Sequence, residues 1–225
     1  MILAKDTLSN RQSGFTLIEL MISTGVFSVI LLICTTAILV IGQQFHKASI
    51  SAITQDTART IMEDVSREVQ LSGRAPSAVV TNAIPTPSVS AICVGTVRYN
   101  FILDYELEDV QVVDAVNRHA PHVLWKDSNP NPSSCVAQDI TTPTPATSGR
   151  ELMAIHTRLN PASGFGITNN DSTGVTQTLY NIDVSIIYGD NAVIDTVNNN
   201  CVSRSGGGSF CGLSELHTAV YRRNI

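Results

Sequence analysis

The chain has 225 residues and a formal net charge of −5, with 43% hydrophobic and 15% charged residues. A negative net charge opposes long-range attraction to phosphate groups, and no basic stripe runs through the sequence, so nucleic acid is not expected as a partner. Only a local patch at Arg222 and Arg223 leaves a weaker form of such binding open.

The first predicted element is a membrane span. Residues Leu20 to Gly42 contain no Asp, Glu, Lys, Arg or Pro, and as an α-helix they would extend roughly 35 Å, enough for one bilayer crossing. The run is too long for an ordinary secretory signal, and no small-x-small cleavage site follows it. Because Lys5 and Arg11 favour an N-terminus inside the cell, the rest of the chain is expected outside.

A single carboxylate, Glu19, stands at the edge of this run. An ionisable side chain at membrane depth is costly, which makes it a functional hypothesis. Cleavage of the Gly14–Phe15 bond would expose an amine one helical turn from Glu19. That amine, or the amine of a neighbouring copy, would offset the carboxylate, whereas loss of one partner would leave a buried charge uncompensated. The alternative is an ordinary anchor helix whose Glu19 reaches the headgroups.

The string Ser-Gly-Phe-Thr-Leu-Ile-Glu-Leu-Met-Ile at residues 13–22 resembles the cleavage and methylation segment of type IV pilins, a family that includes the pseudopilins of type II secretion and competence systems. The resemblance implies that a prepilin peptidase removes residues 1–14 as a cytoplasmic leader, cutting after Gly14, and N-methylates Phe15. It also implies that Glu19 serves filament assembly. The implied partners are other pilin or pseudopilin subunits, an inner-membrane assembly platform and the lipid bilayer.

A helical pattern continues beyond the apolar run. Apolar residues recur at steps of three and four and predict a stripe that packs on a downstream sheet. The stripe consists of Ile53, Ala58, Ile61, Met62, Val65 and Val69. Ser72-Gly73 and the following Pro76 predict the end of the helix. We therefore expect one helix over residues 15–73, roughly 87 Å long, transmembrane over about 20–42 and amphipathic over 43–72.

Residues 74–225 are predicted to form one exported, β-rich domain. Residues 74–89 are rich in Pro, Ser, Ala and Thr without periodicity, which favours an extended connector. Alternation predicts strands at Thr96–Leu103, Asp109–Val113, His122–Trp125, Glu151–Leu159, Thr178–Tyr188 and His217–Arg223. Long loops are expected at 128–134, 141–149, 160–174 and 198–208. The expected fold class is α+β, a long helix packed on an antiparallel sheet, which is the lollipop architecture that the resemblance implies.

Five cysteines divide by location. Cys34 lies in the membrane run and is expected to act as a small packing residue. The other four fall in the exported domain, where oxidising conditions favour disulfides, and four cysteines permit three pairings. We favour Cys201 with Cys211 and Cys93 with Cys135. A zinc site on these cysteines is not favoured, because they form no C-x-x-C pair and no suitably spaced histidine accompanies them.

The sequence offers no defensible catalytic constellation, so we do not expect an enzyme. The histidines are scattered and are expected in loop or surface positions: His46, His119, His122, His156 and His217. Hard carboxylate oxygens could gather calcium, which some pseudopilins bind, at an acidic cluster of Asp104, Glu106, Glu108, Asp109 and Asp114. No twelve-residue calcium loop is present, however. We therefore expect no cofactor or metal, and calcium remains the open alternative.

The finer assignment rests on two weaker resemblances. Residues 58–68 and the closing strand with its Arg223-Asn224 pair are similar to segments of minor pilins and J-type pseudopilins. Many major pilins carry a proline within the membrane run, where this chain has Thr36 and Ala37. The sequence thus predicts a minor pilin or pseudopilin, first in the inner or cytoplasmic membrane and then in a periplasmic or cell-surface filament. The competing hypothesis is a single-pass anchored ectodomain that binds a ligand independently of a filament; the sequence does not choose between pilus, type II secretion and competence systems.

Overall fold

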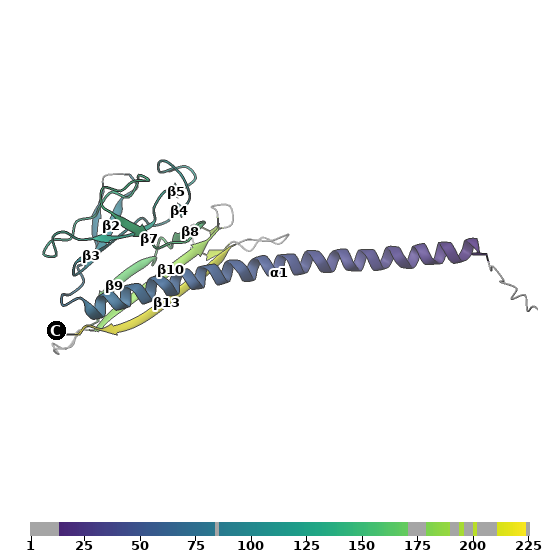
Figure 1. The fold of residues 1–225 in the computed structure, drawn as a ribbon, viewed down its shortest axis with the longest axis horizontal. Helices are drawn as coiled ribbons and strands as arrows, with labels where there is room; N and C mark the ends of the chain where they lie inside the picture. Colours follow the sequence, from purple (N-terminus) through teal and green to yellow (C-terminus); the bar gives the residue numbers. More distant parts are fainter. Residues whose placement is uncertain are drawn as a thin grey trace, which may run out of the picture. The chain divides into compact units, whose positions relative to one another are not determined.

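A computed structural model describes residues 14–83, 86–170, 179–189, 194–195, 200–201 and 211–223. One helix, α1 (Leu17–Leu71, 55 residues), is followed only by strands in the part of the chain that the structure describes (Figure 1). The predicted α+β class is therefore confirmed. The chain divides into two compact units, Met1–Gln44 and Phe45–Ile225, and each is described by itself. The predicted leader lies outside the described residues except for Gly14.

In the first unit, α1 exposes its apolar side chains. Every residue from Gly14 to Ile41 is exposed, because no other described element covers this stretch. The hydroxyl groups within it are satisfied by the helix itself: Ser23 Oγ donates to Glu19 O at 2.7 Å, and Ser28 Oγ donates to Thr24 O at 2.8 Å. Such bonds leave little unmet polarity on an apolar helix.

In the second unit, the remainder of α1 buries one face. The buried residues are Ile50, Thr54, Thr57, Ala58, Ile61, Met62, Val65 and Val69. The predicted stripe was wrong at Ile53, which is 38% exposed. Thr54 takes the buried position instead, because its hydroxyl donates to Ile50 O at 3.1 Å and so brings no unmet polar group inside.

The first sheet has five antiparallel strands in the order β1-β2-β3-β6-β7. Their bounds are β1 (Val80–Asn82), β2 (Val89–Val94), β3 (Val97–Phe101), β6 (Leu124–Ser128) and β7 (Gly149–Glu151). The side chains of β2 alternate between two cores. Ile92 and Val94 belong to the core shared with α1, whereas Val89 and Ala91 pack under Ala137 on the other face.

The second sheet runs in the order β13-β10-β8-β4-β5, with β9 also pairing with β10. Its strands are β4 (Glu106–Leu107), β5 (His119–Ala120), β8 (Thr157–Leu159), β9 (Phe165–Asn169), β10 (Leu179–Tyr188) and β13 (Gly212–Tyr221). The β4–β5 pair is parallel and the other pairs are antiparallel. A short antiparallel ladder joins β11 (Ile194–Asp195) and β12 (Asn200–Cys201).

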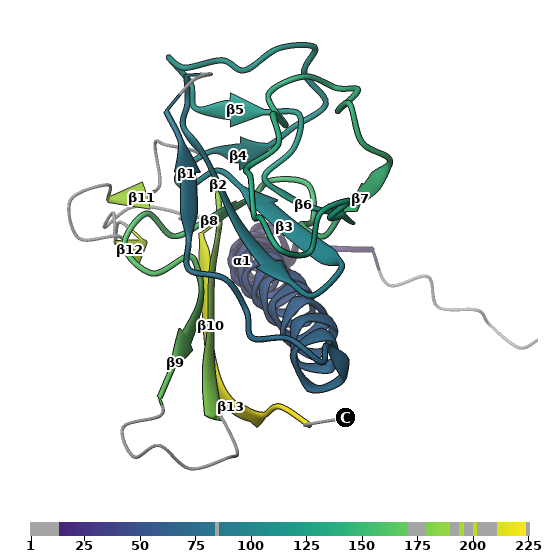
Figure 2. The ribbon, with the colours of Figure 1, turned by 90° about the vertical axis from the view of Figure 1, so that its left-hand side faces the viewer.

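The buried stripe of α1 faces both larger sheets. Its core cluster contains Ile61 and Val65 from the helix, Tyr99 from the first sheet and Val184 from the second. Figure 2 shows this part of α1 with β3 and β6 to one side and β10 and β13 to the other. Gly212 lets β13 approach the helix, because a Cβ there would lie 2.8 Å from Ile50 Cγ2.

Several sequence expectations for this unit were wrong. A single antiparallel sheet was expected, whereas the structure has two larger sheets and a parallel strand pair. Asp109–Val113 forms no strand, and Glu151–Leu159 splits between β7 and β8, which belong to different sheets. The expected connector at 74–89 contains β1, and the expected loop at 160–174 contains β9. These errors share a cause: short strands are fixed by partners distant in sequence, and alternation within one segment does not reveal those partners.

Candidate functional site

The first candidate site is the start of α1. Gly14, Phe15 and Thr16 precede the helix in irregular backbone, and all three are exposed. A Cβ built at Gly14 would meet no atom within 4 Å. The Gly14–Phe15 bond therefore lies in unwound, accessible chain, the form of substrate that a peptidase can bind, and glycine adopts such backbone without steric cost.

Glu19 belongs to the first turn of α1, where Thr16 caps the helix. Thr16 Oγ1 accepts a hydrogen bond from Glu19 N at 3.3 Å, and it donates to Glu19 Oε2 at 3.4 Å. Thr-x-x-Glu is the spacing of a capping box, although here the glutamate reaches the hydroxyl group of the cap residue. A carboxylate in a first turn also meets the positive end of the helix dipole. These local interactions hold Glu19 in the first turn of α1, close in sequence to Phe15.

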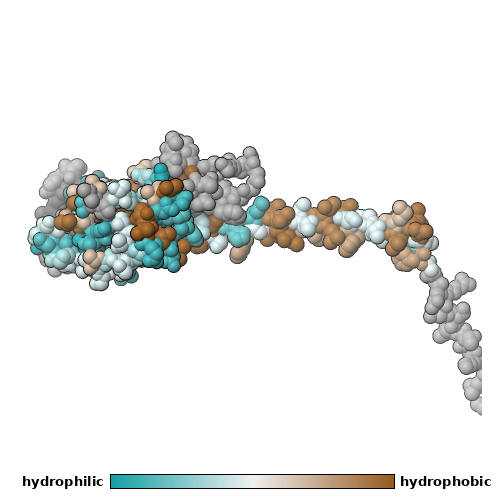
Figure 3. Space-filling view, turned by 90° about the horizontal axis from the view of Figure 1, so that it is seen from above, coloured by the Kyte–Doolittle hydropathy of each residue, from teal (hydrophilic) through white to brown (hydrophobic). Residues whose placement is uncertain are grey.

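The surface that follows Glu19 is apolar on all sides. Exposed large side chains include Ile22, Phe27, Leu32, Leu39 and Ile41. Figure 3 shows this hydrophobic surface in brown along the N-terminal part of α1, with paler small and hydroxyl residues between. By length and composition, α1 contains a segment able to cross a membrane. An apolar surface of this extent fits a lipid environment or the packing of identical helices.

Two disulfides lie in the second unit. Cys93 bonds to Cys135 and Cys201 bonds to Cys211, which are the two pairs favoured above. The first ties residues 135–140 over the outer face of β2, where Ala137 and Ile140 are buried. The second joins β12 to the residue before β13. Cys34 is a free, exposed cysteine of α1.

The acidic residues expected to form one cluster are divided by their partners. Asp104 forms an ion pair with Arg118. Asp114 accepts hydrogen bonds from Asn117, whose backbone N–H lies 3.1 Å from Asp114 Oδ1 and holds the pKa of that carboxyl group below its usual range. Asp109 is exposed in an irregular segment. Glu106 and Glu108 each have a carboxylate oxygen within 4.8 Å of the other and of a ring nitrogen of His156.

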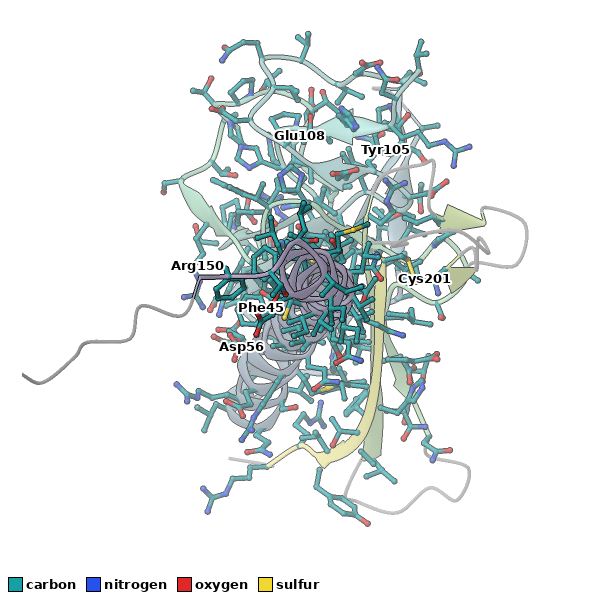
Figure 4. The ribbon with its side chains drawn as sticks, turned by 90° about the vertical axis from the view of Figure 1, so that its right-hand side faces the viewer. Phe45, Asp56, Tyr105, Glu108, Arg150 and Cys201 are labelled. Carbon is teal, nitrogen blue, oxygen red and sulfur yellow. A yellow bond between two sulfur atoms is a disulfide. The ribbon has the colours of Figure 1, made fainter. Side chains whose placement is uncertain are left out.

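His119 and His156 were expected as separate surface residues, and this expectation missed their shared surroundings. His156 Nδ1 lies 3.0 Å from Glu106 Oε1, and His119 Nδ1 lies 2.9 Å from Glu108 Oε2. Beneath them Arg158, whose side chain is fully buried, donates to Glu106 Oε2 at 3.0 Å. Burial lowers the pKa of Arg158 from its usual value, and the carboxylates oppose that shift. Figure 4 shows Glu108 at one end of the second unit, apart from Cys201.

Comparison with known proteins agrees with the first candidate site. Residues 9–35 match the model of the prokaryotic N-terminal methylation motif. The match covers Gly14, Phe15, Glu19 and the first part of the apolar surface. Searches of curated proteins and of solved structures found no match to the chain. The chain therefore carries at residues 9–35 the prepilin-type methylation motif, which is consistent with a type IV pilin or pseudopilin.

Proposed function

We propose that this chain is a minor pilin or pseudopilin, a structural subunit that enters a filament through the N-terminal part of α1. The observation that carries the proposal is the methylation motif on residues 9–35 together with an accessible Gly14–Phe15 bond directly before the helix. Pilin-type subunits are structural rather than catalytic. The proposed partners are a prepilin peptidase, an inner-membrane assembly platform and other subunits of the filament.

In the proposed assembly step, the charge of Glu19 sets how each subunit aligns with its neighbours along the filament. Cleavage after Gly14 creates an ammonium group on Phe15, and methylation of that nitrogen keeps it protonatable. Within a filament, this cation meets the Glu19 carboxylate of a neighbouring subunit in a setting without water. The pair lowers the cost of the buried carboxylate, and a misplaced subunit would leave it uncompensated, typically a penalty of several kcal/mol.

A minor role is supported by two features of α1. The stretch 20–42 contains no proline, and α1 runs without a break from Leu17 to Leu71. Many major pilins carry a proline at which the helix can melt on filament entry. This helix has no such proline. The proposed location is the inner or cytoplasmic membrane with the N-terminus inside, followed by a periplasmic or cell-surface filament.

Two experiments test this function. Mass spectrometry of the chain expressed with a prepilin peptidase should find an N-terminus at methylated Phe15, and an intact leader would contradict the proposal. Replacing Glu19 by Leu should leave cleavage intact while reducing the chain in sheared filaments. Glu63→Leu is the control, because Glu63 is an acid on the same helix with a side chain 63% exposed.

The competing ectodomain hypothesis predicts a different result in the same assay. An anchored, filament-independent protein would stay in the membrane fraction, and crosslinking would recover it as a monomer. The Glu19→Leu and Glu63→Leu variants would then behave alike. Recovery of wild-type chain in the filament fraction, lost on Glu19→Leu, separates the two hypotheses.

A further inference from the structure

We propose that Glu106, Glu108 and His156 bind a divalent transition-metal ion such as Zn²⁺. These residues lie in the second unit and have no part in the proposed assembly through α1. One ligand atom from each of the three lies within 4.8 Å of the others. The proposal therefore adds a ligand to the β-rich unit, independent of the methylation motif.

Backbone pairing between three segments holds the site. Glu106 belongs to β4, Glu108 follows that strand, and His156 directly precedes β8. His156 N donates to Leu107 O at 3.0 Å, and Glu108 N donates to Ala120 O at 3.1 Å. These hydrogen bonds fix the backbone from which the three side chains project, which reduces the ordering needed on binding an ion.

The spacing of the donor atoms suits a small metal ion. His156 Nδ1 lies 3.0 Å from Glu106 Oε1 and 3.8 Å from Glu108 Oε1. Around a tetrahedral zinc with bonds of 2.0–2.1 Å, neighbouring ligand atoms are about 3.3 Å apart. The two observed distances bracket this value. Small rotations of the side chains would therefore bring the three ligand atoms to the distances that a bound ion requires.

The other oxygen of each carboxylate is held by an outer donor. Arg158 Nη2 donates to Glu106 Oε2 at 3.0 Å, and Arg158 Nη2 also donates to Gly189 O at 3.0 Å. His119 Nδ1 lies 2.9 Å from Glu108 Oε2 and donates a hydrogen bond to it when the proton is on Nδ1. Both Oε1 atoms are thereby left facing His156, and outer hydrogen bonds of this kind orient metal-ligating carboxylates.

The local charge also favours a cation. Asp104, Glu106 and Glu108 are opposed by Arg118 and Arg158, so the carboxylates exceed the guanidinium groups by one when the histidines are neutral. A metal ion would place positive charge between two carboxylates that otherwise repel each other. The His156 side chain is 51% exposed and that of Glu108 is 29% exposed, whereas Glu106 is 3% exposed. Solvent therefore has access from the His156 side, and water can complete the coordination.

The donor set selects the class of ion. Calcium and magnesium take oxygen ligands, whereas an imidazole nitrogen beside carboxylates suits zinc and other first-row transition metals. The calcium suggested by the acidic sequence is disfavoured here, because Asp104 and Asp114 are bound to Arg118 and Asn117. Zn²⁺ is accordingly the probe of choice, with Ca²⁺ as the comparison.

A matched control lies on β13. His217 also has two acidic neighbours, but Asp183 Oδ1 lies 2.6 Å from its Nδ1 and Glu215 Oε1 lies 3.4 Å from its Nε2. Because the two carboxylates flank opposite ring nitrogens, they cannot share one ion with the same nitrogen. The variant His217→Asn therefore removes a histidine and two contacts to acids without removing a proposed ligand.

The experiment is isothermal titration of the full-length, tag-free chain in detergent micelles with Zn²⁺ and, separately, with Ca²⁺. We expect one Zn²⁺ per chain, bound more tightly than Ca²⁺. The variants His156→Asn and Glu108→Gln should each weaken Zn²⁺ binding at least about tenfold, the lower end of the effect of losing even an outer-shell partner. Asn suits position 156, because φ is 65° there and Asn tolerates the left-handed region.

Several results would overturn the proposal. One is equal Zn²⁺ affinity in wild type, His156→Asn and Glu108→Gln, with circular dichroism showing that all three are folded. Another is loss of Zn²⁺ binding in His217→Asn, and a third is Ca²⁺ binding tighter than Zn²⁺. X-ray absorption at the zinc edge gives an independent check: one imidazole and otherwise oxygen ligands support the site, whereas a sulfur ligand contradicts it.

Discussion

Lys126 Nζ lies 2.8 Å from Asp64 Oδ2, and this ion pair joins α1 to β6. Asp64 also accepts hydrogen bonds from Tyr99 Oη at 3.0 Å and from Arg150 Nη2 at 2.6 Å. Burial and the Asp64 charge together raise the pKa of Tyr99 above its usual value, so the phenol stays protonated and donates. One helix carboxylate thus gathers three donors from the first sheet.

Replacing Asp64 by Ala should lower the free energy of unfolding by about 1–3 kcal/mol, because it leaves the buried Tyr99 without its acceptor and leaves Lys126 with Glu68 as its remaining acidic partner. Denaturant unfolding of the chain in micelles measures the change. The matched control is Glu63→Ala, which removes an exposed pair with Arg59 and should cost no more than about 0.5 kcal/mol. Equal losses in both variants would show that the Asp64 contacts contribute little.

A second ion pair is fully buried between neighbouring strands. Arg98 on β3 lies opposite Asp127 on β6, with Nε to Oδ1 at 2.9 Å and Nη2 to Oδ2 at 2.6 Å. Arg98 Nη1 also donates to Val136 O at 2.9 Å, and Asn100 Nδ2 donates to Asp127 Oδ1 at 3.3 Å. Both charged side chains are at most 5% exposed. If one of the two residues were removed, water could therefore not solvate the charge of the other.

Arg98→Met should destabilise the second unit by about 3–5 kcal/mol, since it leaves the Asp127 carboxylate buried and uncompensated. Adding Asp127→Leu should recover part of that loss, because two apolar residues need no charge balance. The comparison is made by equilibrium unfolding of the two variants. A double variant less stable than Arg98→Met would contradict this account of the loss.

Local patterns in the sequence predicted the helix well. The uncharged run and the three-and-four spacing predicted a helix over 15–73, and α1 spans Leu17–Leu71. The prepilin-type segment was equally recognisable from the sequence, since Gly14, Phe15 and Glu19 lie within a few residues of each other. Features encoded within one or two helical turns need no knowledge of the rest of the fold.

Pairings between distant segments were not predictable in the same way. Glu106 meets Arg158 across 52 positions, and Asp64 meets Lys126 across 62. The two-residue strands β4 and β5 carry no alternation that a sequence could display. Spacing along the helix assigned no partner to Asp64, which accepts hydrogen bonds from Tyr99, Lys126 and Arg150 of the first sheet. Long-range partners decide such positions, and a single sequence does not name them.

The two disulfides should differ in their contributions to stability. The Cys93–Cys135 bridge spans 42 positions, whereas Cys201–Cys211 spans 10. In the loop-entropy model, a longer closed loop restricts the unfolded chain more, and the difference here is about 1 kcal/mol. We therefore expect Cys93→Ser/Cys135→Ser to lower the free energy of unfolding by about 1 kcal/mol more than Cys201→Ser/Cys211→Ser. The reverse order, measured by denaturant unfolding, would show that native contacts and not loop length dominate.

The pair of His217 and Asp183 makes stability depend on pH. The two residues are opposite each other on β13 and β10, and His217 Nδ1 lies 2.6 Å from Asp183 Oδ1. The hydrogen bond with Asp183 raises the pKa of His217 above its ordinary value, against the opposing effect of burial. The protonated histidine is thus favoured in the folded state. Its contribution to stability is fully present below the unfolded pKa and is lost as pH rises through the folded pKa.

The contribution is small, because the His217 side chain is 59% exposed, and exposed pairs contribute about 0.2–1 kcal/mol. The difference in free energy of unfolding between wild type and His217→Asn should therefore be larger at about pH 5.5 than at about pH 9, on either side of the ordinary histidine pKa of about 6.5. High salt should reduce the difference at the lower pH by screening the pair. NMR titration of the imidazole checks the cause directly. A His217 pKa at or below its ordinary value, or a stability difference that grows with pH, would contradict the assigned role of Asp183.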